Sequence, residues 1–297
     1  MENLFPANGK LEKVFEDKQK GFISDEIDKN TFIKLMNAMS INQKYCDSIV
    51  LYTSLQDSID ELIDYLNNIS FDGKYSDYAK ANRLTLNVLS SFYSLIEFCN
   101  KNIENFKDDY AHELYDKYFS YRLFYYLRVY MTHKSLGVTS FRMTINADAM
   151  IVTANVDIEK MINSDAIKKA FCEELKQLNV NSVPLNDYIS EFKEAVNELM
   201  FTIFKNESRK IIENYIFIKM NIPNSNIKIS ECFIKDENGK AHSLTKSITN
   251  LCEIYSKGLI YKNKIEINPD LSKECFDLFA AISFLYFNEE NVVVKPD

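Results

Sequence analysis

Residues 121–137 read YRLFYYLRVYMTHKSLG, and this stretch decides the fold class that the sequence predicts. Apolar side chains occur on almost every side of a helix drawn through it, which indicates a helix that is buried on most sides. The same stretch nevertheless carries Arg128 and, five residues later, His133. Because burying an unpaired arginine is costly, we expect Arg128 either to have a partner or to face a polar cleft.

The composition supports a mainly helical protein. The 297-residue chain contains only 6 Gly and 5 Pro, so few residues interrupt helices or form tight turns. Hydrophobic residues make up 46% of the chain, with 21 Phe and 18 Tyr, which is ample for a core. A chain of this length folds as one large domain or as two smaller ones.

On both sides of residues 121–137, apolar residues recur at the three- and four-residue spacing of helices. This spacing predicts helices over residues 25–39, 43–69, 78–106, 110–136, about 164–178 and about 187–220. Gly137 is expected to lie just beyond the fourth of these helices, at its C′ position. The period then changes, and alternating apolar residues predict a β-hairpin at about 138–157.

The two ends of the chain have a more mixed pattern. Residues 1–23 are expected to be irregular or strand-like. Strands are predicted at 227–235 and 258–268, and a helix at 271–287. We therefore predict three segments: an N-terminal lead-in and helix (1–42), a helical domain (43–222) and a mixed α/β segment (223–297), with the main boundary at Pro223–Asn226.

Charge and cysteine usage exclude several classes of protein. The net charge of −8 argues against a general nucleic-acid coat, which binds through many Lys and Arg. The six cysteines form no CxxC pair and no zinc spacing with the three histidines, so we expect reduced thiols in a cytoplasmic protein and neither a metal nor another cofactor. The N-terminal sequence has no apolar signal region, and no apolar stretch is long enough to span a membrane.

Arg128 and His133 have an ordinary structural explanation. Arg128 could pair with a nearby acid, and His133 could cap the last turn of its helix, with Lys134 also interacting with the helix dipole. Five residues on a helix correspond to about 140° around the axis, so the two side chains do not share one face. They could converge if the helix end were distorted, or at a two-fold axis between two copies of the chain.

A larger pattern resembles a known family. YRLFYYLRVYMTH, with Arg122, Leu127, Arg128, Tyr130 and His133, is similar to the Arg-x4–6-His helix of the HEPN superfamily. NRLTLNVLSSFYSLIEF is similar to the preceding helix in uncharacterised bacterial members, and its matching residues are Asn82, Arg83, Asn87, Ser90 and Ser91. The resemblance covers residues 43–165 and extends at most to 220.

The resemblance implies an all-α, HEPN-like helical bundle that dimerises, with the hairpin following its motif helix. It also implies metal-independent cleavage of RNA through the 2′-hydroxyl, as in toxins and antiviral effectors. In this reading His133 is the general acid or base, and Arg128 binds the scissile phosphate and stabilises the transition state. The candidates for substrate positioning are Tyr130, Asn87, Arg83 and Lys134, for which ordinary packing or surface exposure is an equal alternative.

One residue departs from the family pattern. The residue after the motif arginine is usually polar, often Asn, and here it is Val129. Positions 129 and 133 are neighbours on a helix, so a polar residue at 129 could orient the imidazole and valine cannot.

Two other functions stay open. In the first, the HEPN-like core is a catalytically silent, dimeric interaction module that binds an antitoxin or another protein. In the second, residues 223–297 are the working part, and the helical core is their scaffold.

Overall fold

The computed structural model describes residues 8–17, 21–69, 74–145, 150–221, 232–244, 247, 260–261 and 264–265, leaving out some side chains within these ranges. Its helices are α1 (Lys29–Asn68), α2 (Tyr75–Asn102), the π-helix η1 (Lys107–Ala111), α3 (His112–Lys117), α4 (Phe119–His133), α5 (Ile158–Ile162), α6 (Lys169–Gln177) and α7 (Leu185–Met220). Its strands are β1 (Glu12–Asp17), β2 (Gly21–Glu26), β3 (Val138–Ile145), β4 (Met150–Asp157), β5 (Ser182–Pro184), β6 (Cys232–Lys235), β7 (Ala241–Ser243), β8 (Ile260–Tyr261) and β9 (Lys264–Ile265). The protein is mainly helical with small antiparallel sheets, which confirms the predicted class.

The chain divides into two compact units. Unit 1 comprises Met1–Ile49 and Phe201–Asp297, and unit 2 comprises Val50–Met200. Both divisions fall inside helices, because α1 and α7 each contribute to the two units. The predicted boundary at Pro223–Asn226 lies outside the described residues, and the three-segment division stays a prediction.

Unit 1 contains an antiparallel sheet with the strand order β2-β1-β6-β7. The strand-like lead-in expected before residue 24 therefore pairs with a strand from the C-terminal segment. Glu12 of β1 lies opposite Lys235 of β6, and their side chains form an ion pair in which both are largely buried. A small core joins this sheet to the parts of α1 and α7 in the same unit; its buried members are Leu35, Ala38, Ile218, Cys232, Ile234 and Leu244.

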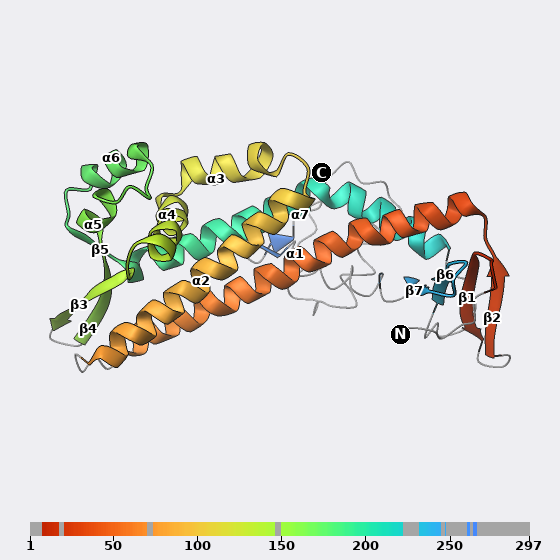
Figure 1. The fold of residues 1–297 in the computed structure, drawn as a ribbon, viewed down its shortest axis with the longest axis horizontal. Coiled ribbons are helices and arrows are strands. Elements are labelled where there is room, and N and C mark those ends of the chain that lie inside the picture. The colour runs from red at the N-terminus through yellow and green to blue at the C-terminus, as the bar shows by residue number, and fades with distance from the viewer. Residues whose placement is uncertain are drawn as a thin grey trace. The chain divides into compact units, whose positions relative to one another are not determined.

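Unit 2 is organised around α2 and α4. In Figure 1, α2 runs beside the part of α1 that belongs to this unit, and the hydroxyls of Ser58 and Ser91 lie 3.3 Å apart across that contact. Phe92 of α2 contacts Tyr121 of α4 edge to face at 5.2 Å. Phe124 of α4 stacks on Phe192 of α7 at 4.2 Å, and Tyr126 stacks on Phe171 of α6 at 4.5 Å. Three neighbouring helices thus explain why α4 is apolar on almost every side.

The first two predicted helices are one helix. We predicted separate helices over 25–39 and 43–69, whereas α1 is continuous from Lys29 to Asn68. The intervening residues, Ser40–Ile41–Asn42, include neither Gly nor Pro, so nothing in the backbone chemistry forces a break there. Asn42 is itself buried.

The single helix predicted over 110–136 is wrong in its extent. The segment is divided into η1, α3 and α4, and Tyr118 between α3 and α4 has an extended backbone. Residues of α7 stabilise this break: the Tyr118 hydroxyl donates to Glu198 at 2.6 Å, and the Ser120 amide at the start of α4 donates to Glu191 at 3.1 Å. These partners are distant in sequence, so local periodicity could not reveal the break.

The other end of α4 also differs from the prediction. The helix ends at His133 with Lys134 as its C-cap, so Gly137 is not the C′ residue, and its backbone is not left-handed. A side chain at Gly137 would meet Met131: a Cβ placed there would lie 2.4 Å from the Met131 sulfur. A side chain at this position would therefore require Met131 to move.

The predicted hairpin is confirmed as β3 and β4, which pair antiparallel, and β5 adds a third strand. Asn82 of α2 fixes the start of this hairpin. Its buried side-chain amide accepts a hydrogen bond from the Val138 amide at 3.0 Å and donates to the Val138 carbonyl at 2.9 Å. The same amide nitrogen donates to the Tyr78 carbonyl at 2.9 Å.

Later elements follow the sequence reading in part. The helix predicted over 164–178 is α6, which begins later, at Lys169, and the long helix expected after Pro184 is α7. The strand predicted at 227–235 corresponds to β6, and the strand predicted at 258–268 corresponds to the short pair β8 and β9. The helix predicted at 271–287 lies outside the described residues.

Candidate functional site

Arg128 lies on α4 where this helix packs against α2. Its guanidinium carbon is 3.3 Å from the centre of the Tyr93 ring of α2, which is a cation–π contact. The side chain is half-buried, and among the described residues no carboxylate forms an ion pair with it. Arg128 therefore keeps its charge available while an aromatic ring supports its position.

Arg128 also lines an open hollow of about 620 Å³, which we call the aromatic hollow. Side chains from α2, η1, α3 and α4 line it, together with Lys168 at the start of α6. Its floor contains buried rings, among them Phe92, Tyr121 and Tyr126. Burial raises the pKa of Tyr121 and of Tyr126, so both hydroxyls remain protonated at neutral pH.

His133 is exposed at the last position of α4 and is not among the residues that line the aromatic hollow. Its separation from Arg128 by about 140° around the helix accounts for this difference. One chain thus places the arginine, and not the histidine, in the hollow. Val129 is half-buried and presents no polar group to His133.

The four candidate positioning residues have different environments. Tyr130 is buried in the core. Arg83 and Asn87 are exposed, four residues apart on one side of α2. Lys134 forms an ion pair with Asp165 at 2.5 Å. The structure therefore does not gather these residues around Arg128 in the hollow.

Three basic residues that the sequence did not single out for function line the hollow with Arg128. They are Lys107 on η1, His112 at the start of α3, and Lys168. The His112 side chain is 70% exposed, with Nδ1 3.7 Å from the Asp108 carboxylate. The π-helix that carries Lys107 was not predicted, and without it the sequence offers no signal that these residues meet.

The aromatic side chains of α4 bear on dimer formation. An aromatic surface on 118–131 too large for one partner helix to cover would favour a dimer. Helices α2, α6 and α7 of unit 2 contact most of those rings, while Tyr125 remains 40% exposed. A two-fold dimer stays a prediction, and it rests on the positions of Arg128 and His133 more than on uncovered rings.

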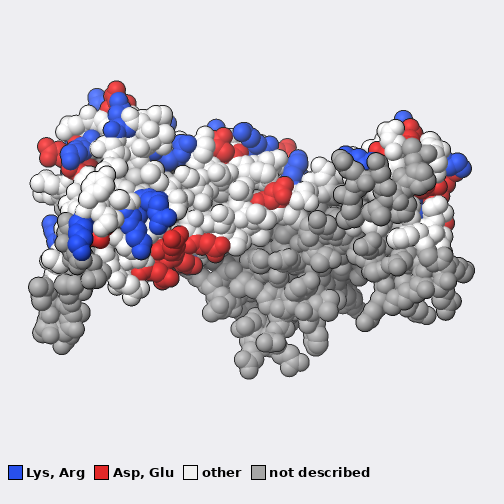
Figure 2. Space-filling model, turned by 60° about the horizontal axis from the view of Figure 1, so that its bottom comes forward, with Lys and Arg blue, Asp and Glu red and all other residues white. Residues whose placement is uncertain are grey.

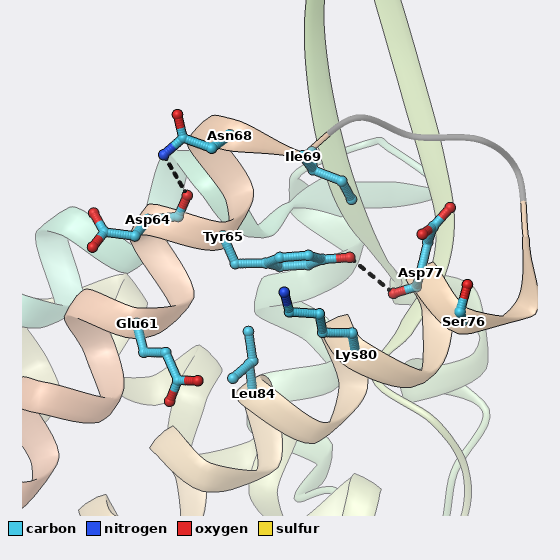
Figure 3. A pocket seen from close by; sticks show the side chains of 9 residues that line it. All are labelled: Glu61, Asp64, Tyr65, Asn68, Ile69, Ser76, Asp77, Lys80 and Leu84. Atoms are coloured by element: carbon cyan, nitrogen blue, oxygen red, sulfur yellow. Dashed lines mark hydrogen bonds between the residues drawn. The ribbon is translucent and has the colours of Figure 1, made fainter.

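A second pocket, of about 600 Å³, lies where α1 ends and α2 begins. Figure 3 shows Tyr65 and Lys80 at its centre: the Tyr65 hydroxyl donates to the Asp77 carbonyl at 3.1 Å, and the Lys80 nitrogen lies 4.6 Å from the centre of the Tyr65 ring. Burial raises the pKa of Tyr65. None of the predicted site residues lines this pocket.

Other classes of site find no support among the described residues. Within them, no three His, Cys, Asp or Glu side chains are grouped so that they could hold a metal ion. The described cysteines, Cys46, Cys99, Cys172 and Cys232, are buried, and burial raises the pKa of Cys99 to about 12 and that of Cys232 to about 11. In the part of the chain that the structure describes, no helix has the length and apolar character needed to cross a membrane.

Comparisons of the chain with protein-family models, with curated proteins and with solved structures found no match.

Proposed function

We propose that the protein is a HEPN-type ribonuclease that cleaves RNA without a metal at a site shared by two copies of the chain. The observation that carries the proposal is the state of Arg128: a half-buried guanidinium, supported by Tyr93, lines an open hollow and has no ion-pair partner among the described residues. Such a cation is suited to a phosphate, because the N–H groups at its edge stay free to donate.

The chemistry follows from these two side chains. His133 removes the proton from a ribose 2′-hydroxyl, which attacks the adjacent phosphorus, and Arg128 stabilises the negative charge of the transition state. The bond to the 5′-oxygen breaks, that oxygen takes a proton from water, the protonated His133 neutralises the resulting hydroxide, and the other product carries a 2′,3′-cyclic phosphate. Because His133 lies away from the hollow of its own chain, the catalytic pair joins His133 of one copy with Arg128 of the other across a two-fold axis.

The net charge of −8 is compatible with a local RNA site. On the face of unit 2 shown in Figure 2, one group of basic side chains lies directly beside a group of acidic ones, and both kinds are interspersed elsewhere. A phosphate chain would therefore contact only a small basic area. We expect binding that is local and weakens with added salt, because few phosphates are contacted.

The first test is cleavage of varied RNAs by the purified protein in the presence of EDTA. Wild type should release 2′,3′-cyclic ends, while His133→Ala and Arg128→Ala should be inactive with unchanged circular dichroism. Arg142→Ala, which removes an exposed arginine from β3, and His242→Gln, which replaces a histidine of unit 1, are the matched controls and should stay active.

The second test concerns the shared site. Light scattering should give twice the chain mass of 34.6 kDa. Mixing the two inactive variants should restore about a quarter of the wild-type activity, because half of the randomly formed dimers then contain one intact site out of two. A site within one chain predicts no recovery.

A second candidate function is a catalytically silent interaction module. It is favoured by the partly exposed apolar side chains of Leu86, Tyr93 and Tyr125 on neighbouring helices, and by Val129 beside His133. Val129→Asn separates the two functions, because it should increase cleavage if orientation of His133 limits the rate. No cleavage by wild type or by Val129→Asn would favour the interaction module.

A further inference from the structure

The aromatic hollow has features that a phosphate site alone does not require. Two of its tyrosines, Tyr93 and Tyr125, are 37% and 40% exposed, although most rings around α4 are buried. Phe92, Tyr121 and Tyr126, which also line the hollow, are buried. Exposed rings beside a cation are the arrangement by which proteins stack nucleic-acid bases.

Charge in the hollow is locally positive in a chain that is acidic as a whole. Its lining includes the cations of Arg128, Lys107 and Lys168 against the carboxylates of Glu97 and Asp116, an excess of one positive charge with histidine counted as neutral. Lys107 and Lys168 are exposed and have no ion pair with any residue that the structure describes. Both ammonium groups are available to an anion.

Polar groups that can read a base are also present. The hydroxyls of Tyr115 and Tyr126 lie 3.1 Å apart, and both residues line the hollow with Asn100 and Glu97. An asparagine amide both donates to and accepts from the edges of bases, and a glutamate carboxylate accepts from their amino groups. A volume of about 620 Å³ is in the range of pockets that hold small ligands.

We infer that the aromatic hollow binds one nucleotide, with its base stacked on Tyr125 and its phosphate at Arg128 and Lys168. The inference rests on the proposed function in one respect: the bound nucleotide is taken to be part of a single-stranded RNA substrate, next to the phosphate that is cleaved. Binding in the hollow then holds RNA at the site, although the net negative charge of the chain repels RNA. Tyr93 positions the guanidinium.

The π-helix has a defined place in this inference. It brings Lys107 and the start of α3 to the hollow after the chain turns at Asn105, whose positive φ of 51° is tolerated by asparagine. π-helical turns are often retained at functional sites despite their poor intrinsic stability. Here the turn places a cation and His112 opposite the tyrosines of α2 and α4.

Calorimetric titration at low salt tests the inference with AMP, GMP, CMP and UMP as probes, and with ribose 5-phosphate and inorganic phosphate as partial probes. At least one nucleotide should bind more tightly than either partial probe. Tyr125→Leu should weaken its binding about tenfold, which is the stacking contribution of one base. Tyr75→Leu, which changes an 84%-exposed tyrosine of α2 outside the hollow, is the control.

The phosphate position has an equally close control. Lys168→Gln should weaken nucleotide binding, while Lys169→Gln, at the next position, which is also exposed but does not line the hollow, should not. A short single-stranded RNA should compete with the bound nucleotide if the source is RNA, whereas tight mononucleotide binding without such competition identifies a free nucleotide as the ligand.

The inference and the proposed ribonuclease can fail separately, because mononucleotides contain no scissile bond. Binding without cleavage would support the hollow and overturn the ribonuclease. Cleavage by a protein that binds no mononucleotide, or binding unchanged in Tyr125→Leu and Lys168→Gln, would overturn the nucleotide site. If inorganic phosphate and every nucleotide bound equally tightly, the base would make no contribution and would not be stacked in the hollow. Binding of an acidic peptide in place of nucleotides would show that the occupant is a protein.

Discussion

Asn82 offers a sharp test of how the hairpin is attached to the helices of unit 2. Its side chain is 4% exposed and makes three hydrogen bonds, of which two are to the backbone of Val138 and one is to the Tyr78 carbonyl. Although the resemblance to HEPN proteins includes Asn82, these contacts give it a structural task. Asn82→Ala should therefore loosen the start of β3 without touching the aromatic hollow.

The expected magnitude comes from those contacts. A buried hydrogen bond contributes about 0.5–1.5 kcal/mol, and leaving a buried backbone group unpaired costs more, so losing both bonds to Val138 should cost about 2–3 kcal/mol. For a unit of this size each kcal/mol lowers the unfolding temperature by about 2–4 °C. We thus expect a decrease of about 4–12 °C.

Two measurements check this expectation. Thermal unfolding followed by circular dichroism should show the decrease, and hydrogen exchange should become faster at the Val138 amide while the amides of α7 stay protected. Asn82→Asp should be at least as destabilised at neutral pH, because its carboxylate cannot donate to the Val138 and Tyr78 carbonyls. Asn87→Ala, an exposed change on the same helix, should stay within about 0.5 kcal/mol of wild type. An Asn82→Ala protein with the stability and the Val138 protection of wild type would refute the reasoning.

Two further predictions concern ion pairs. Glu12→Gln should destabilise unit 1 by about 3 kcal/mol, because it removes the carboxylate that pairs with Lys235 in a largely buried position. The hydrogen bond with Lys235 lowers the pKa of Glu12, so the ion pair stabilises the fold fully above pH 4.5, the ordinary pKa of glutamate, and this stabilisation is lost as the pH falls below 4.5. The urea midpoints of wild type and Glu12→Gln should therefore converge in acid. A difference between the midpoints that stays constant with pH would contradict the role given to this ion pair. Arg122→Gln should cost about 2–3 kcal/mol in chemical unfolding, because it removes the ion pair with Glu174 at 2.6 Å, and Arg122→Lys should recover only part of it, since lysine lacks the planar fork. An unfolding midpoint unchanged in Arg122→Gln would show that this pair does not hold α4 to α6.

The sequence predicted the elements whose determinants are local. Regular apolar spacing marks α2, alternation marks β3 and β4, and Pro184 precedes α7 as expected. The break at Tyr118 was missed because its hydrogen-bond partners, Glu191 and Glu198, lie more than seventy residues away. Nothing in the spacing of apolar residues carries information about such contacts.

The candidate site was predictable only in its central residue. Arg128 was identified because a cation in an apolar helix needs an explanation, and that argument uses local sequence alone. The hollow that it lines also depends on Lys107 and Lys168, which approach it through the π-helix and the start of α6. Their contribution follows from tertiary structure, so sequence patterning could not have placed them there.

A comparison within α4 explains why only one of its two arginines is assigned to the site. Arg122 and Arg128 both match the HEPN-like pattern, and both are partly buried. Arg122 pairs with Glu174 and donates to the backbone carbonyls of Tyr115 and Asp116, so its charge and its N–H groups serve the packing of α3, α4 and α6. Arg128 rests on a ring, which holds its position without neutralising its charge or occupying its donors. An arginine held in this way is stable in a folded protein and still able to bind an anion, which is why Arg128→Ala should abolish the proposed activity while Arg122→Gln should chiefly reduce stability.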